Sequence, residues 1–189
     1  MIRLGYAFTG SFCTFAESFA ALERLAALGE YDIQPIFSEN AASLDTRFGR
    51  AQVHLERARE ITGHEPICTL VGAEPIGPRK LLDLLLIAPC TGNTLAKLAN
   101  GIADSTVSLA AKAHLRNGRP LVLAVSTNDA LAAAARNIGE LMNRRDVFFV
   151  PFRQDSPREK PRSAVADFGL IEPALQAAVH GIQAFPLLL

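Results

Sequence analysis

The chain has 189 residues, of which 49% are hydrophobic and 20% charged, and nineteen basic residues balance nineteen acidic ones. This composition is typical of one globular domain with a sizeable core and excludes a disordered or fibrous protein. The balanced charge gives no reason to expect nucleic acid or an anionic membrane surface as a partner. Any anion-binding site must therefore be local.

The cysteines and histidines show no metal-binding pattern. Cys13, Cys68 and Cys90 form no CxxC spacing and suit reduced thiols of a cytoplasmic protein, and the four histidines are scattered. The N-terminus lacks a long apolar segment, and the apolar run LLDLLLIA is far shorter than the roughly 20 residues of a membrane span. We therefore expect a cytoplasmic protein without a metal site and without a membrane segment.

Short apolar runs alternate with segments of helical period along the chain. Strand followed by helix, repeated, predicts a parallel sheet with helices on both faces, because each crossover is right-handed. The expected fold is a single α/β domain, a three-layer doubly wound parallel sheet of Rossmann-like type. The predicted strands are Ile2–Phe8, Tyr31–Phe37, Leu84–Ala88, Leu121–Val125 and Val147–Val150, with a weaker one at Ile67–Val71.

The composition changes after about Arg153. The stretch RQDSPREKPRSA is polar and proline-rich, which predicts a loop or mobile flap over residues 153–165. Residues 172–189 predict a last helix followed by an apolar tail that could dock on a neighbouring molecule.

Small polar residues follow several of the predicted strands, at the sheet edge where parallel α/β folds bind ligands. Thr9-Gly10-Ser11 follows the first strand, and Thr14 to Glu17 has the pattern of a capping box that opens a helix. Such a helix start offers free N–H groups and a positive dipole end to a phosphate. Similar stretches follow three later strands: residues 38–40 (SEN), 89–94 (PCTGNT) and 126–129 (STND). Together they predict a polar rim for a phosphorylated ligand.

Each of these features also has a purely structural explanation. A serine at a strand-to-helix junction, such as Ser11 or Ser38, is often only an N-cap. Half of the residues in GNTLAKLANGIAD could serve only to begin or end helices. Cys90 has no histidine near it in the sequence, so a small semi-buried thiol is favoured over a nucleophile.

The stretch PCTGNTLAKLANGIADSTVSLAAKA resembles the P-x-[ST]-x-N-T-x-x-K-x-A-x-G-I-x-D signature of a flavoprotein superfamily. That superfamily includes phosphopantothenoylcysteine decarboxylase, peptidyl-cysteine decarboxylases and flavin prenyltransferase, and the likeness covers positions 1 to about 150. Within it, GYAFTGSFCTF, PIFSENAASLDTRFG, STNDAL and FVPFRQDSPREKP are similar to the family of dipicolinate synthase B subunits of spore-forming bacteria, over nearly the whole chain.

The superfamily resemblance implies FMN bound on the polar rim. Carried over by position, Gly10, Ser11 and Ser38 would hold the phosphate. The resemblance also implies flavin at the boundary between subunits, and hence a homo-oligomer that is a trimer or a multiple of trimers. The residues that would line the flavin or its ribityl chain are Pro89, Thr91, Gly92, Asn93 and Thr94.

Two departures from the superfamily pattern bear on the chemistry. The decarboxylases carry a histidine at a position that corresponds here to Pro75, by an ungapped count from Asp83, so cysteine decarboxylation by that route is not expected. Their P-x-M-N motif, whose asparagine contacts a substrate carboxylate, becomes VSTN here. Only Asn128 of that motif remains.

The resemblance to the synthase B subunits implies an oxidoreductase subunit that helps form pyridine-2,6-dicarboxylate during sporulation, in the cytoplasm of the mother cell. Its substrate would be dihydrodipicolinate or hydroxytetrahydrodipicolinate, from the lysine branch. The nicotinamide-dependent A subunit of dipicolinate synthase would be its partner. The lack of GxGxxG after the first strand agrees with NAD(P) lying on the A subunit, not on this chain. The alternatives are a non-catalytic protein that stabilises the A subunit, and an independent FMN-dependent decarboxylase or transferase.

Two residues are candidates for contact with a dicarboxylate substrate. Arg47 lies just beyond the second predicted strand and has a guanidinium that can hold a carboxylate in two places, with a solvated surface arginine as the alternative. Asn128 is the predicted catalytic and substrate-binding residue, because its amide offers donors and an acceptor without charge. A cap of a helix near Asp129 is the alternative for Asn128.

Overall fold

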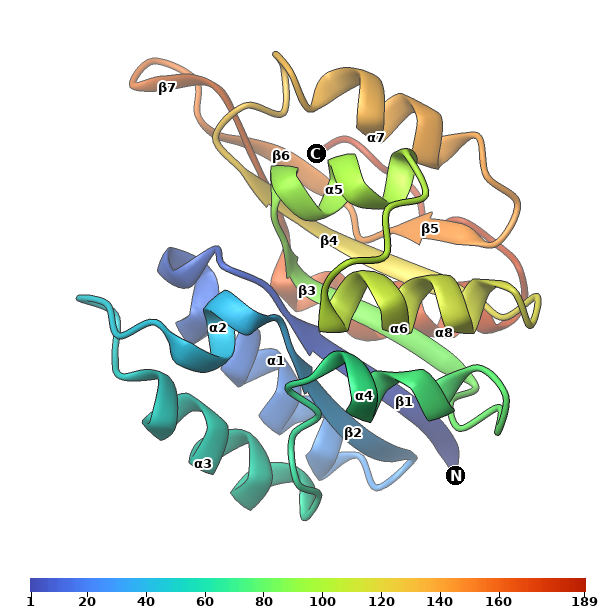
Figure 1. Ribbon diagram of the computed structural model, residues 1–189. Coiled ribbons are helices and arrows are strands. Elements are labelled where there is room, and N and C mark those ends of the chain that lie inside the picture. Colours follow the sequence, from blue (N-terminus) through green and yellow to red (C-terminus); the bar gives the residue numbers. More distant parts are fainter.

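The computed structural model describes all residues, 1–189, and contains one mixed sheet with helices on both faces (Figure 1). The seven strands have the order β2-β1-β3-β4-β7-β6, with β5 also paired to β4. The pairs β1–β2, β1–β3, β3–β4 and β4–β5 are parallel, whereas β7 is antiparallel to both β4 and β6. The strands are β1 (Ile2–Phe8), β2 (Tyr31–Phe37), β3 (Leu84–Cys90), β4 (Leu121–Thr127), β5 (Val147–Phe149), β6 (Phe152–Ser156) and β7 (Lys160–Ala166).

Helices cover the two faces of the sheet in two groups. Helix α1 packs with α3 and, through η3, with α8 on one face, while α6 packs with α4, α5 and the sheet on the other. This arrangement confirms the predicted three-layer α/β fold. The helices are η1 (Phe12–Thr14), α1 (Phe15–Ala27), α2 (Glu39–Ser43), α3 (Ala51–Thr62), α4 (Leu70–Ala73), η2 (Glu74–Ile76), α5 (Gly92–Ala99), α6 (Thr106–Leu115), α7 (Ala135–Met142), η3 (Phe168–Leu170) and α8 (Ile171–Val179). None of them is both long and apolar enough to cross a bilayer.

A buried aromatic cluster holds the start of α1 against the sheet. The ring of Phe8, at the end of β1, lies 4.8 Å from the ring of Phe19 and 4.6 Å from that of Phe37, measured between centroids. Below it, the Tyr6 hydroxyl donates to the Ser18 carbonyl at 2.8 Å. Stacked, fully buried rings resist displacement, so the loop between β1 and α1 has a fixed position at the carboxyl edge of the sheet.

The expected weak strand at Ile67–Val71 is wrong. Ile67 forms only an isolated parallel bridge with Ile36, and residues Leu70–Ala73 form the short helix α4. The Thr69 side chain accepts a hydrogen bond from the Gly72 N–H and so caps this helix. Threonine at this position satisfies a helix-start donor, which favours a helical turn over further strand pairing.

The expected loop at residues 153–165 is also wrong, because strands β6 and β7 form a hairpin there. The short strand β5 pairs only with Leu121 to Leu123, which leaves the end of β4 free on that side. Strand β7 occupies this free edge by pairing with Ser126 and Thr127. The C-terminal tail then lies along β6 of the same chain, where the Phe152 N–H donates to the Leu187 carbonyl at 2.9 Å.

Candidate functional site

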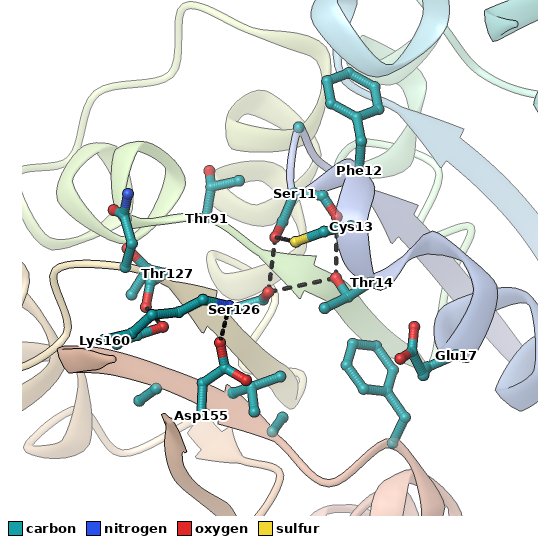
Figure 2. Close-up of a pocket in the computed structure, with 18 of the residues that line it drawn as sticks. Ser11, Phe12, Cys13, Thr14, Glu17, Thr91, Ser126, Thr127, Asp155 and Lys160 are labelled. Atoms are coloured by element: carbon teal, nitrogen blue, oxygen red, sulfur yellow. Dashed lines mark hydrogen bonds and ion pairs between the residues drawn. The ribbon is translucent and has the colours of Figure 1, made fainter. Parts of the chain in front are cut away.

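A cleft of about 1110 Å³ opens at the carboxyl ends of β1, β3 and β4 (Figure 2). Parallel α/β sheets bind ligands at this edge where the strand order reverses, and here β2 and β3 lie on opposite sides of β1. The volume is sufficient for a ligand of cofactor size. The walls come from the loop after β1, the start of α5, the turn after β4 and the β6–β7 hairpin. The predicted site residues that line it are Gly10, Ser11, Arg47, Thr91, Gly92, Asn93 and Asn128.

Three hydroxyl groups, those of Ser11, Thr14 and Ser126, form a hydroxyl cluster within the cleft. The Ser11 and Ser126 oxygens are 2.7 Å apart, and the Thr14 oxygen lies 3.3 Å from that of Ser126 (Figure 2). Thr14 and Ser126 are buried. The cluster joins the start of α1 to the end of β4. Because the Thr14 proton bonds the Ser11 carbonyl, the Ser11 hydroxyl, which accepts from or donates to Ser126, is the member that can donate to a ligand in the cleft.

Thr14 does not form the predicted capping box. Its hydroxyl donates to the Ser11 carbonyl at 2.9 Å, and no side-chain cap bonds to the start of α1. The physical reason is the 3-10 turn η1, which precedes α1 and directs the Thr14 side chain back toward Ser11. Thr14 thus belongs to the hydroxyl cluster instead of capping the helix.

Hydrogen bonds hold the start of α5 beside the cleft. The Thr91 side chain caps the helix by accepting from the Thr94 N–H at 3.2 Å, while the Thr91 N–H donates to the Thr9 hydroxyl at 3.1 Å. The Thr9 hydroxyl donates in turn to the Pro89 carbonyl at 2.7 Å. The first N–H groups of a helix have no partner within it, so those of Gly92 and Asn93 are available to a ligand.

Three of the predicted FMN-binding residues do not line the cleft. Ser38 caps α2 by accepting from the Ala41 N–H at 3.3 Å. Pro89 is buried within β3, and Thr94 is buried with its hydroxyl 3.0 Å from that of Thr91. In the isolated chain these residues hold the elements around the cleft in place. Contact of their side chains with FMN stays a prediction.

Asn128 and Arg47 both line the cleft with exposed side chains. Asn128 lies on the turn after β4 and makes no side-chain hydrogen bond, and because α7 begins only at Ala135 it does not cap a helix. Arg47 lies in a tight turn between Thr46 and Gly49, before the first turn of α3, with its guanidinium 4.8 Å from the Phe48 ring centroid. Neither the Asn128 amide nor the Arg47 guanidinium has a hydrogen-bond or ion-pair partner in the chain.

Sequence reasoning missed the contribution of the hairpin. The Lys160 ammonium lies 2.7 Å from the Asp155 carboxylate, the Arg153 guanidinium lies 3.3 Å from that of Asp167, and all four residues line the cleft. Arg24, from α1, donates to the Phe168 carbonyl at 2.9 Å nearby. Asp, Ser and Pro are turn-forming residues, so Asp155-Ser156-Pro157 is compatible with a turn between two strands, but the polar, proline-rich composition of the whole segment suggested a loop instead.

The two cysteines near the site have different environments. Cys90 is fully buried at the end of β3, and burial raises the pKa of its thiol, so it stays protonated and inert. Cys13 is exposed and lines the cleft, with its sulfur 3.8 Å from the Ser11 hydroxyl. No group of three or more His, Cys, Asp or Glu side chains is placed to hold a metal ion.

The donor set of the cleft fits a phosphorylated cofactor such as FMN. The Ser11 hydroxyl of the cluster and the N–H groups at the start of α5 are neutral donors, which are the usual partners of a phosphate. A side chain at Gly10 would meet no atom of the chain closer than 3.8 Å, so internal packing does not require glycine there. The space beside Gly10 is open to a ligand that approaches the backbone closely.

The sequence profile of the flavoprotein family matches residues 1–174. The chain belongs to the flavoprotein family. This flavoprotein is 42% identical over 186 residues to the dipicolinate synthase B subunit of Bacillus subtilis (strain 168), covering 98% of this chain and 92% of that one. The crystal structure of the dipicolinate synthase B subunit from Bacillus halodurans C is similar with a TM-score of 0.91 and 40% identity, and covers 100% of this chain and 96% of that one. The predicted resemblance to the synthase B subunits is therefore confirmed.

More distant flavoproteins share the fold. A dodecameric FMN-dependent Ubix-like decarboxylase from Escherichia coli O157:H7 matches with a TM-score of 0.63 and 20% identity, and the match covers 79% of this chain and 80% of that one. The similarity to the synthase B subunits is both closer and more extensive than this one, because it includes the whole of this chain.

Proposed function

We propose that this flavoprotein is a component of a dipicolinate synthase and helps form pyridine-2,6-dicarboxylate from dihydrodipicolinate together with a nicotinamide-dependent A subunit. The observation that carries the proposal is the similarity to a dipicolinate synthase B subunit over the full chain, with a TM-score of 0.91. An independent decarboxylase is less well supported, since the FMN-dependent Ubix-like decarboxylase matches with a TM-score of 0.63 and 20% identity. We extend the proposal to a role in the cytoplasm of a sporulating mother cell.

We further propose that the cleft holds FMN. The hydroxyl cluster and the N–H groups at the start of α5 would hold the phosphate end, and Thr91, Gly92 and Asn93 would contact the rest of the cofactor. When bound, FMN would supply a two-electron acceptor, which suits oxidation of a dihydropyridine to a pyridine. NAD(P) would lie on the A subunit.

The chain's own residues would bind and orient the dicarboxylate. The Asn128 amide can donate to a carboxylate and accept from a ring N–H, and its exposed position in the cleft leaves it free to do so. The Arg47 guanidinium has no carboxylate partner in the chain and can hold a ligand carboxylate with two parallel bonds. Donors held in fixed positions orient the substrate ring for the reaction.

Reconstitution of the two synthase components tests the proposed function. The A subunit would be assayed with and without this chain and with and without added FMN, following the absorbance of pyridine-2,6-dicarboxylate. We expect full activity only with both proteins and FMN. Full activity without FMN would reduce this chain to a non-catalytic partner, and full activity in the absence of this chain would reject the proposal.

We also propose that the chain forms a homo-oligomer, a trimer or a multiple of trimers. Exposed apolar side chains on the C-terminal tail support this, with Ile182 58%, Phe185 77% and Leu188 69% exposed. Large apolar side chains that are this exposed on one short segment favour a partner surface that covers them. Light scattering of the purified protein measures the mass directly, and a monomeric mass at micromolar concentration would reject the assembly.

A further inference from the structure

The ion pair between Asp155 and Lys160 spans the β6–β7 hairpin and forms part of the cleft wall. The ammonium nitrogen and the carboxylate oxygen are 2.7 Å apart, and the side chains are 58% exposed for Lys160 and 36% for Asp155. Figure 2 shows both side chains in the cleft that contains Ser126. The pair is therefore accessible to a ligand from the cleft side.

The backbone of the hairpin is irregular where the pair forms. Gln154 pairs with Ala164 and Ser156 pairs with Lys160, so residues 161–163 of β7 oppose only Asp155 of β6. Such bulges redirect side chains and are common beside binding sites. This bulge ends the regular pairing of the hairpin at the point where Asp155 and Lys160 face the cleft.

The hairpin is anchored to the end of β4 and is not a free flap. The Leu131 N–H donates to the Arg162 carbonyl at 3.0 Å, and the Ser163 hydroxyl donates to the Thr127 carbonyl at 3.3 Å. Both bonds tie β7 to the segment that carries Asn128. The strand that carries Lys160 is thus anchored beside the cleft, and a specific ligand contact requires such a support.

Lys160 is one of four cations that line the cleft, with Arg24, Arg47 and Arg153. The pKa of its ammonium is raised, mainly by the hydrogen bond that it donates to Asp155 and by the charge of that carboxylate, with a smaller contribution from Cys13. Cys13, at the start of α1, lines the same cleft. Because exposed ion pairs contribute little to stability, a ligand carboxylate can replace Asp155 at small cost.

We propose that Lys160 binds a carboxylate group of the ligand in the cleft, and that Asp155 holds the Lys160 ammonium until the ligand displaces it. The choice of a cyclic dicarboxylate as that ligand rests on the proposed function. Arg47 and Asn128 line the same cleft, and we assign the second carboxylate of the ligand to one of them. The Asp155 carboxylate then acts as a competitor within the site, so the two members of the pair have opposite effects on affinity.

Titration with pyridine-2,6-dicarboxylate, followed by calorimetry, tests this directly. Lys160→Met removes the ammonium and is expected to weaken binding about tenfold or more. Asp155→Asn removes the competing carboxylate and is expected to tighten binding several-fold. A merely structural ion pair would give changes in the same direction for both variants, because either substitution breaks the same contact.

Two control variants separate charge from folding. Arg158→Met removes a cation from the exposed hairpin turn that does not line the cleft, and should leave the affinity unchanged. Lys160→Arg retains the charge and should keep most of the affinity. Circular dichroism of all variants, with their unfolding midpoints, verifies that the fold is intact.

Opposite shifts for Lys160→Met and Asp155→Asn support the proposal, and any other pattern overturns it, including failure of the unmodified protein to bind the probe. The reconstituted synthase assay is read separately. Opposite shifts without turnover would keep Lys160 as a carboxylate-binding residue and reject the proposed function. Turnover by the reconstituted synthase, together with unaltered binding in both variants, would support the proposed function and reject Lys160 as a carboxylate-binding residue.

Discussion

The hydroxyl cluster of Ser11, Thr14 and Ser126 carries no charge and thus suits an anionic group. Ser11→Asp would place a carboxylate next to Ser126, whose hydroxyl now lies 2.7 Å from that of Ser11. We expect FMN affinity to fall at least about tenfold, because like charges repel the phosphate. Flavin fluorescence titration measures this, with Ser11→Ala as the uncharged control. Unchanged FMN affinity in a folded Ser11→Asp variant would exclude a phosphate at this position.

Asn128 does not cap a helix in the structure, so a substitution there tests contact with the substrate alone. The structure places it on a turn without hydrogen-bond partners, and the N-cap of α7 is Ala134. Asn128→Asp should therefore leave the free energy of unfolding within about 0.5 kcal/mol of the unmodified protein. A charge that repels a dicarboxylate should lower kcat/KM of the reconstituted synthase about tenfold or more. Normal turnover would show that Asn128 contacts no reacting group.

At the scale of elements, the position of α5 depends on a glycine at its first residue. A Cβ on Gly92 would lie 2.7 Å from the Thr127 hydroxyl and 2.8 Å from the Asp129 carboxylate. Gly92→Ala must move the start of α5 or the turn after β4, and we expect a destabilisation of about 1–3 kcal/mol with weaker FMN binding. Urea unfolding and flavin titration measure the two effects.

The same helix-forming substitution at Gly139 of α7 is a matched control for Gly92→Ala. A Cβ at Gly139 meets no atom within 4 Å. Gly139→Ala should stabilise the protein by roughly 0.5–1 kcal/mol, because alanine loses less backbone entropy in a helix. Equal effects at both positions would mean that the close contact of α5 with the β4 turn is not what positions the helix.

For the whole molecule, a buried histidine predicts how stability depends on pH. Burial lowers the pKa of His114 from 6.5 to about 4, and its Nε2 bonds to the Pro120 carbonyl at 2.9 Å. Between these pH values the unfolded chain binds more protons than the folded one, so stability falls as pH falls. We expect a loss on the order of 2 kcal/mol between pH 7 and 4.5.

Urea unfolding at the two pH values measures this loss. His114→Gln should flatten the pH dependence and leave a smaller slope from His54, whose pKa is also lowered by burial. His180→Gln, at the exposed end of α8, is the matched substitution to compare with it. The prediction is wrong if His114→Gln retains the full loss of stability at pH 4.5.

Much of the fold could be predicted from local patterns, because strand and helix positions depend on hydrophobic period. Strands β1 and β2 have the predicted bounds, and β3 and β4 extend only two residues beyond them. The hairpin at residues 152–166 could not be predicted in this way. It forms because β5 is short and leaves an edge of β4 open, which is a property of the assembled sheet.

The flavoprotein family, the position of the cleft at the carboxyl edge of the sheet and most of the predicted residues that line it follow from the sequence, since strand ends and helix starts have local signals. Which of these residues lie in contact is known only from the folded chain. It brought Ser126 to Ser11 and Thr14, left Ser38 outside the cleft, and added Lys160 and Asp155 to its wall. Such contacts depend on strand order and on pairing at the sheet edge, which long-range packing sets and local periodicity does not encode.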